Sequence, residues 1–136
     1  MYLLDTNVVS ELRRPRPHAG VVAWLGGVPN DKLFLSAVTM GDLQAGIERT
    51  RKQDPDKAAA IEAWVDGLTH AYNLLSMDGP TFRAYARLMH RRSDALAEDA
   101  MIAATAIVND LTVVTRNVRD FRHFGVRTFD PFAARA

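Results

Sequence analysis

The chain has 136 residues, of which 48% are hydrophobic and 24% are charged, a composition typical of one globular domain. It contains no cysteine, which excludes disulfides, thiolate metal sites and a cysteine nucleophile. The formal net charge is only +1 and indicates no class of partner, although basic residues gather in four stretches, at 13–18, 49–52, 83–92 and 116–123.

No apolar run approaches the roughly 20 residues that a membrane-spanning helix needs. An acidic residue, Asp5, comes too early for the apolar segment of a signal peptide. We therefore expect a cytoplasmic protein without membrane contact.

Short apolar runs alternate with helical patterns along the whole chain. The expected strands, in chain order, are 2–4, 33–35, 73–75, 111–114 and 126–129. The expected helices begin at the caps Thr6, Ser36 and Asp78, follow Pro55, and include a short helix around 21–25 and an alanine-rich helix over 96–108. This alternation predicts an α/β three-layer sandwich whose sheet has four or five short, mostly parallel strands.

Acidic and amide side chains stand where such a sheet binds ligands, beyond the carboxyl ends of its strands. Asp5 directly follows the first strand, and Asn117 and Asp120 follow the fourth. Asp42 lies on the helix after the second strand, and Asp99 lies in the first turn of the alanine-rich helix. We expect these groups to meet at one edge of the sheet.

Helical spacing places Asp99 roughly 60° from the centre of an apolar stripe, at the rim of the buried face. That stripe consists of Leu96, Ala100, Ala103, Ala104 and Ile107. The alanines allow the helix to lie close to the sheet, which brings the short aspartate near the strand ends.

Each acid also has a simpler interpretation, as a helix cap or a solvated surface residue. Clustered carboxylates, however, repel one another and persist with a proton or a cation. An all-oxygen set without cysteine or a histidine pair favours Mg²⁺ or Mn²⁺ over zinc and indicates metal-assisted phosphodiester hydrolysis, with arginines on the phosphates.

Four segments resemble, in order, the motifs of PIN-domain toxins of the VapC or FitB type. They are LDTNVVSEL at 4–12, SAVTMGDLQAGI at 36–47, EDAMIAATA at 98–106 and TRNVRDF at 115–121. The resemblance spans nearly the whole chain and implies a single PIN domain over 1–136. It implies a metal-dependent endoribonuclease that acts on RNA as the toxin of a type II toxin–antitoxin system. A homodimer that forms a hetero-oligomer with a small DNA-binding antitoxin is also implied.

The resemblance also assigns roles to individual residues. The catalytic acids would be Asp5, Asp42, Asp99 and Asp120. The metal ligands would be Asp5, Asp99 and Asp120, and the supporting residues would be Thr6, Thr115 and Asn117. Whether Asn117 or Asp120 supplies the fourth site residue stays open.

The chain departs from the family pattern at Asp42, where these toxins usually have glutamate. Because the side chain is shorter, an alternative function stays open. The chain would then be a catalytically weakened PIN-like module with a nucleic-acid-binding or regulatory role. A haloacid-dehalogenase-type phosphatase is disfavoured, because Asn7 occupies the position where its second acid would stand.

Overall fold

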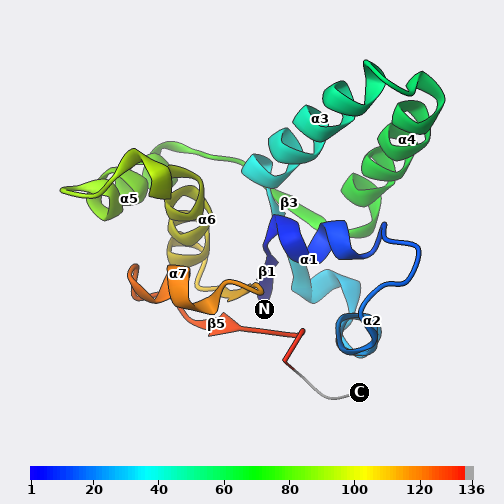
Figure 1. Ribbon diagram of the computed structural model, residues 1–136. Helices are drawn as coiled ribbons and strands as arrows, with labels where there is room; N and C mark the ends of the chain where they lie inside the picture. Colours follow the sequence, from blue (N-terminus) through cyan, green and yellow to red (C-terminus); the bar gives the residue numbers. More distant parts are fainter. Residues whose placement is uncertain (134–136) are drawn as a thin grey trace.

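The computed structural model describes residues 1–133 and shows a central sheet with helices on both faces (Figure 1). The strands are β1 (Tyr2–Leu4), β2 (Leu33–Ser36), β3 (Asn73–Leu75), β4 (Thr112–Val114) and β5 (Thr128–Phe129). The α-helices are α1 (Thr6–Glu11), α2 (Ala19–Gly26), α3 (Ala37–Arg51), α4 (Pro55–Ala71), α5 (Gly79–Met89), α6 (Ala97–Val108) and α7 (Val118–Arg122). Two 3₁₀ turns, Asn30–Lys32 and Asp94–Leu96, precede β2 and α6.

The five strands form one parallel sheet in the order β3-β2-β1-β4-β5. The chain builds outward from β1 to β3 and then returns to the other side of β1 with β4. Leu4 of β1 is the register partner of both Leu35 and Val114, so the residues after these positions leave the sheet together. The predicted α/β class and the predicted number of strands are confirmed.

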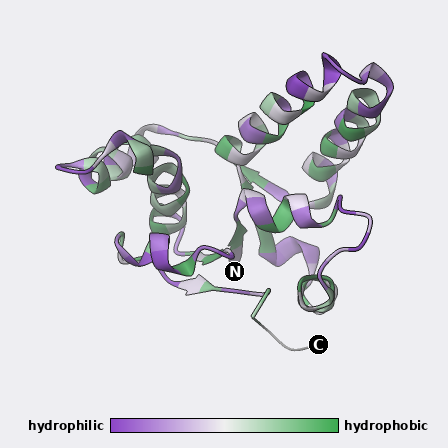
Figure 2. Cartoon of the chain, in the orientation of Figure 1, coloured by the Kyte–Doolittle hydropathy of each residue, from purple (hydrophilic) through white to green (hydrophobic). Residues whose placement is uncertain are grey.

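Consecutive residues of β1 enter two different cores, because side chains alternate across a strand. Leu3 packs with α6 and α7 on one face, beside Ala103 and Phe121. Leu4 packs on the other face with residues of α1, α2 and α4. In Figure 2 the central strand is green, while the turn between α3 and α4 is purple. Two buried faces make this the expected three-layer arrangement.

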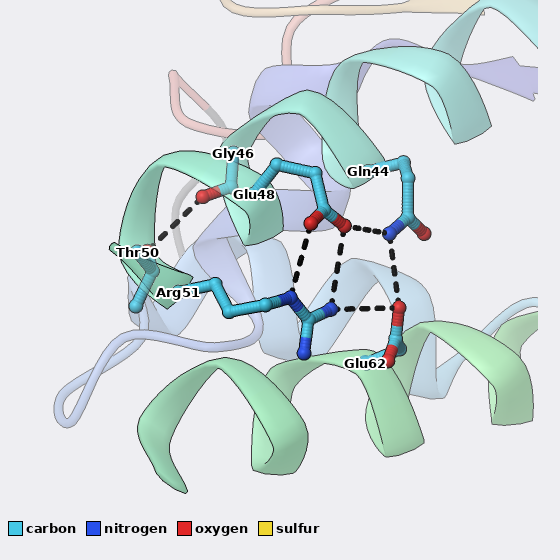
Figure 3. A network of polar contacts seen from close by, with 6 residues as sticks. All are labelled: Gln44, Gly46, Glu48, Thr50, Arg51 and Glu62. Carbon is cyan, nitrogen blue, oxygen red and sulfur yellow. Dashed lines mark hydrogen bonds and ion pairs between the residues drawn. The ribbon is translucent and has the colours of Figure 1, made fainter. Parts of the chain in front are cut away.

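The α3–α4 hairpin projects from the sheet and has a small core of its own, made by Ile47, Ala58 and Val65. A polar network joins the two helices outside that core (Figure 3). The Arg51 guanidinium contacts Glu48 of its own helix at 3.0 Å and Glu62 of α4 at 3.1 Å. These side chains are largely open to solvent, where such ion pairs add little to the free energy of unfolding.

Several details of the sequence prediction were wrong. Thr6 does not cap α1: the cap is Asp5, whose side chain accepts a hydrogen bond from the Thr6 amide, and Thr6 is the first helical residue. The short helix α7 was not predicted, and β5 has only two of the four expected residues. Ile107, which was assigned to the apolar stripe of the alanine-rich helix, is 44% exposed. Helix α6 is instead buried on all its sides between positions 102 and 106.

No helix within residues 1–133 is both long enough and apolar enough to cross a membrane.

Candidate active site

Asp5 is held at the carboxyl end of β1 by three hydrogen bonds and is 5% exposed. Its Oδ1 accepts from the Thr6 amide at 2.8 Å. Its Oδ2 accepts from the Thr115 hydroxyl at 2.8 Å and from the Asn7 side-chain amide at 3.2 Å. Burial raises the pKa of Asp5, the hydrogen bonds lower it, and the charge of Asp42 raises it further. Asp5 is therefore both a helix cap and a fixed carboxylate of the site.

Thr115 joins the end of β4 to the end of β1, and it is fully buried. Its Oγ1 donates to Asp5 and accepts from the Asn117 amide at 2.9 Å. The side-chain oxygen Oδ1 of Asn7 accepts a hydrogen bond from the Arg116 backbone amide at 3.3 Å. Asn7 was not among the predicted site residues, although it stands two positions after Asp5 in the first turn of a helix.

Asp42 reaches the site from α3. Its Oδ2 accepts from the Thr6 hydroxyl at 3.1 Å, and that hydroxyl also lies 3.1 Å from the Thr39 hydroxyl. Thr39 is fully buried, so it fixes the start of α3 against α1. Thr6, predicted as a supporting residue, thus orients Asp42.

Asp99 reaches the site from the first turn of α6 and does not cap that helix, which lacks a side-chain cap. Burial raises the pKa of Asp99 to about 6, and the charges of Asp5 and Asp120 add to the effect. Asp120 is exposed in the first turn of α7, so its charge acts on the site from the rim.

Glu98, also from α6, was missed as a site residue. A hydrogen bond with the Asp42 carboxyl raises the pKa of Glu98 to about 7, with further contributions from burial and from the charges of Asp42, Asp99 and Asp5. Glu98 stands inside the third motif, next to Asp99. Its contact with Asp42 depends on how α3 and α6 sit relative to each other, which the sequence does not reveal.

Asn117 contributes to the acidic cluster only through its backbone amide. Its amide donates to Thr115, while its side chain makes no cap hydrogen bond with α7 and is exposed. The structure therefore brings Asp5, Asp42 and Asp99 together, adds Glu98, and leaves Asp120 and Asn117 at the edge.

The donor chemistry of this cluster fits a hard divalent cation. Within residues 1–133, no three acidic or histidine side chains are already arranged around one point as metal ligands. The raised pKa values of Asp5, Asp99 and Glu98 nevertheless reflect carboxyl groups whose ionised forms are disfavoured by burial and by one another. A cation held by carboxylate oxygens relieves both effects, and oxygen ligands suit Mg²⁺ or Mn²⁺.

A groove of about 580 Å³ opens beside the acidic cluster, between α1, α3 and α4. Asp42, Glu98 and Thr6 line one end of it. Arg13, Arg49 and Trp64 are also among its lining residues.

Comparison with known proteins identifies the fold family. The profile described as the PIN domain matches residues 2–126. The chain belongs to the PIN-domain family.

This PIN protein has relatives that match it over nearly their whole length. It is 35% identical to the toxin FitB of Neisseria gonorrhoeae, covering 97% of this chain and 99% of FitB. It is 32% identical to the VapC ribonuclease Y4jK of Sinorhizobium fredii, covering 97% of this chain and 98% of that protein. The crystal structure of FitAcB from Neisseria gonorrhoeae superposes with a TM-score of 0.88 at 33% identity, covering 98% of this chain and 100% of the other.

Proposed function

We propose that this PIN protein is a metal-dependent endoribonuclease and the toxin of a type II toxin–antitoxin system. The observation that carries the proposal is the convergence of carboxyl groups from β1, α3 and α6 at one edge of a PIN fold. A FitB relative named as a toxin and a VapC relative named as a ribonuclease support the same assignment.

Asp5 and Asp99 would hold the Mg²⁺ or Mn²⁺ ion, with Asp120 contributing from the rim. When bound, such an ion polarises a phosphodiester and lowers the pKa of a coordinated water. Thr115 and Asn7 fix the direction of the Asp5 carboxylate, since both donate to Oδ2. Asp42 and Glu98 line the groove beside these residues, and one of their carboxyl groups is suited to take the proton of an attacking water.

The natural partners we propose are an RNA substrate and a small DNA-binding antitoxin that occludes the acidic cluster. We further propose a homodimer that assembles with the antitoxin into a hetero-oligomer. Support comes from the likeness to FitAcB, which covers 98% of this chain and 100% of the other.

The test is cleavage of bacterial total RNA by purified protein freed of any antitoxin, with Mg²⁺ or Mn²⁺ and with EDTA. Asp99→Asn removes one proposed ligand, and Asp66→Asn is the matched control, because Asp66 lies exposed on α4 away from the cluster. We expect discrete fragments with native protein and with the Asp66 variant, and none with Asp99→Asn or EDTA.

A folded native protein that cleaves no RNA with either metal would contradict the enzymatic proposal. The alternative is then a regulatory nucleic-acid-binding module, which the aspartate at position 42 favours because the family usually has the longer glutamate there. RNA binding without cleavage would identify that alternative.

A further inference from the structure

Helix α7 carries Asp120, one of the proposed metal ligands, but it is too short to hold its own position. It has five residues, and no side chain caps its first turn. A helix of this length is unstable by itself, so contacts with the rest of the protein must fix it. Phe121 and Phe124 are buried in the core beside α6, against which α7 packs (Figure 1). These two rings fix one face of the helix, and polar contacts at its ends set its direction.

One polar contact holds each end of α7. At its start, the Asn117 amide donates to the Thr115 hydroxyl at 2.9 Å. At its end, a guanidinium nitrogen of Arg92 donates to the carbonyl oxygen of His123 at 2.8 Å. Carbonyl groups at the end of a helix lack partners within it, and a cationic donor is favourable there. Asp120 lies between these two contacts.

The loop that carries Arg92 leads into the start of α6. Arg91 ends α5 in a left-handed backbone conformation, with φ of 62°. The Arg92 amide then donates to the Met89 carbonyl oxygen at 3.0 Å, and the Ser93 side chain caps the 3₁₀ turn that precedes α6. The first turn of α6 carries Asp99. The backbone of Arg92 is therefore fixed relative to the helix that supplies Asp99.

The Arg92 side chain is committed to α7. Its guanidinium carbon lies 4.8 Å from the centroid of the Phe124 ring, which is buried. Among residues 1–133, none of the ion pairs involves Arg92. A planar guanidinium combines attraction to an aromatic face with directed hydrogen bonds, which the ammonium group of lysine reproduces only in part. Arg92 thus joins the end of α7 to the segment that precedes α6.

This link connects the two helices that carry Asp99 and Asp120. The charge of Asp120 contributes to the raised pKa of Asp99, so the two carboxyl groups already interact. Asp120 is nevertheless exposed at the rim, and within residues 1–133 no three acidic side chains surround one point. The direction of α7 therefore decides whether Asp120 joins the other ligands of a metal ion.

We propose that Arg92 is a positioning residue for the metal site, which holds the end of α7 against the start of α6 and so keeps the Asp120 carboxylate close to Asp99, where both bind the ion. The inference rests on the proposed metal-dependent function. It goes beyond that function by assigning the placement of a ligand to a residue that lies outside the acidic cluster and outside all four motifs.

The experiment measures Mn²⁺ binding without RNA, from the loss of the free-ion EPR signal, for native protein and for Arg92→Ala and Arg92→Lys. Arg122→Ala is the matched control, because it removes the same charge from an exposed position on α7 itself. If Arg92 acted only through its charge, its removal would tighten the binding of a cation. We expect Arg92→Ala to weaken binding roughly three- to tenfold, less than the usual effect of a residue that contacts a ligand directly. Arg92→Lys still donates to the His123 carbonyl and should recover part of this loss, and Arg122→Ala should bind Mn²⁺ at least as tightly as native protein.

A double-mutant cycle shows whether Arg92 acts through Asp120. In an Asp120→Asn background, Arg92→Ala should cost less than about twofold in Mn²⁺ affinity, because the ligand that it positions is absent. Hydrogen exchange of the metal-free protein gives a second readout. The amides of α7 should exchange faster in Arg92→Ala than in native protein, while those of α3 and α4 should not change.

Several outcomes would overturn the proposal. They are unchanged or tighter Mn²⁺ binding by Arg92→Ala, an equal loss in Arg122→Ala, an equal cost of Arg92→Ala in both backgrounds, and an Asp120→Asn variant or a native protein in which Asp120 makes no difference to Mn²⁺ affinity. RNA cleavage, measured separately, tests the function on which the proposal rests. If the cycle shows coupling but native protein cleaves no RNA, the role of Arg92 stands and the ribonuclease function fails. If native protein cleaves RNA and Arg92→Ala binds Mn²⁺ like it, the function stands and the role of Arg92 fails.

Discussion

The hydroxyl of Thr115 donates a 2.8 Å hydrogen bond to Oδ2 of Asp5, although the two residues are 110 positions apart. Sheet register explains the contact, because Leu4 and Val114 are partners and each is followed by one of these residues. The same hydroxyl accepts the Asn117 amide, so its own proton is directed at the carboxylate. Thr115 therefore sets the direction in which Asp5 presents its second oxygen.

Thr115→Val should lower RNA cleavage by about 10- to 100-fold, the usual cost of losing a residue that orients a metal ligand. It should also destabilise the fold by about 1–3 kcal/mol, because buried Asp5 and the Asn117 amide each lose a partner. Cleavage rates and urea unfolding measure the two effects. Thr115→Ser keeps the hydroxyl and should retain most activity; if it is as inactive as the valine variant, the hydrogen bond is not the cause.

Asp99→Asn should stabilise the protein in EDTA at pH 8 and have little effect near pH 4. In the folded protein, burial and the charges of Asp5 and Asp120 raise the pKa of Asp99 from 3.8 to about 6. Folding therefore favours the protonated form of Asp99. The contribution of Asp99 to the free energy of unfolding is fully present below about pH 4 and is lost as the pH rises through about 6. Asparagine does not ionise and avoids that loss.

The expected gain at pH 8 is on the order of 1 kcal/mol, less than the full linkage value, because Asp99 is only half-buried and partly screened by water. Urea unfolding at both pH values measures it, with Asp66→Asn as the control for loss of one surface charge. A variant less stable than the native protein at pH 8 would mean that the ionised Asp99 is favoured in the fold.

The sequence was sufficient for the parts of the site that follow from strand ends and helical spacing. Asp5 and Thr115 each follow a parallel strand directly, and Asp99 lies at the edge of the buried face of the alanine-rich helix α6. For such residues, the position in a strand or helix is enough to predict that the side chain reaches the edge of the sheet. The four motifs identified the family.

What the sequence did not predict depends on packing between elements. Glu98 meets Asp42 because α6 and α3 lie against the same edge, and Glu11 is buried because a loop folds back over it. The Asp5 cap was assigned to Thr6, since both residue types cap helices and only the backbone dihedrals separate them. Helix α7 is five residues long, too short for a periodic pattern.

The contact between Glu98 and Asp42 leads to a prediction about the missing methylene at position 42. Glu98→Gln should reduce cleavage about tenfold in the native background. The Asp42 side chain reaches about 1.5 Å less far into the site than the usual glutamate, and we expect the Glu98 carboxyl group to supply the missing oxygen. In an Asp42→Glu background the same substitution should cost about threefold or less, because the longer side chain reaches further by itself. A double-mutant cycle on kcat/KM measures the coupling. Equal losses in both backgrounds would show that the two carboxyl groups act independently.

Glu11→Ala should destabilise the protein by about 1–3 kcal/mol, a large effect for a loop that lies outside the acidic cluster. Glu11 is 6% exposed, and its Oε2 accepts the His18 amide at the start of α2. Alanine leaves that amide without its partner and the carboxylate space unfilled. Glu11→Gln keeps an acceptor oxygen and loses only the pair with exposed Arg14, which contributes little. Urea unfolding should therefore place the glutamine variant near the native protein and the alanine variant well below it. If glutamine is as damaging as alanine, the negative charge holds this loop, and the hydrogen bond to His18 does not.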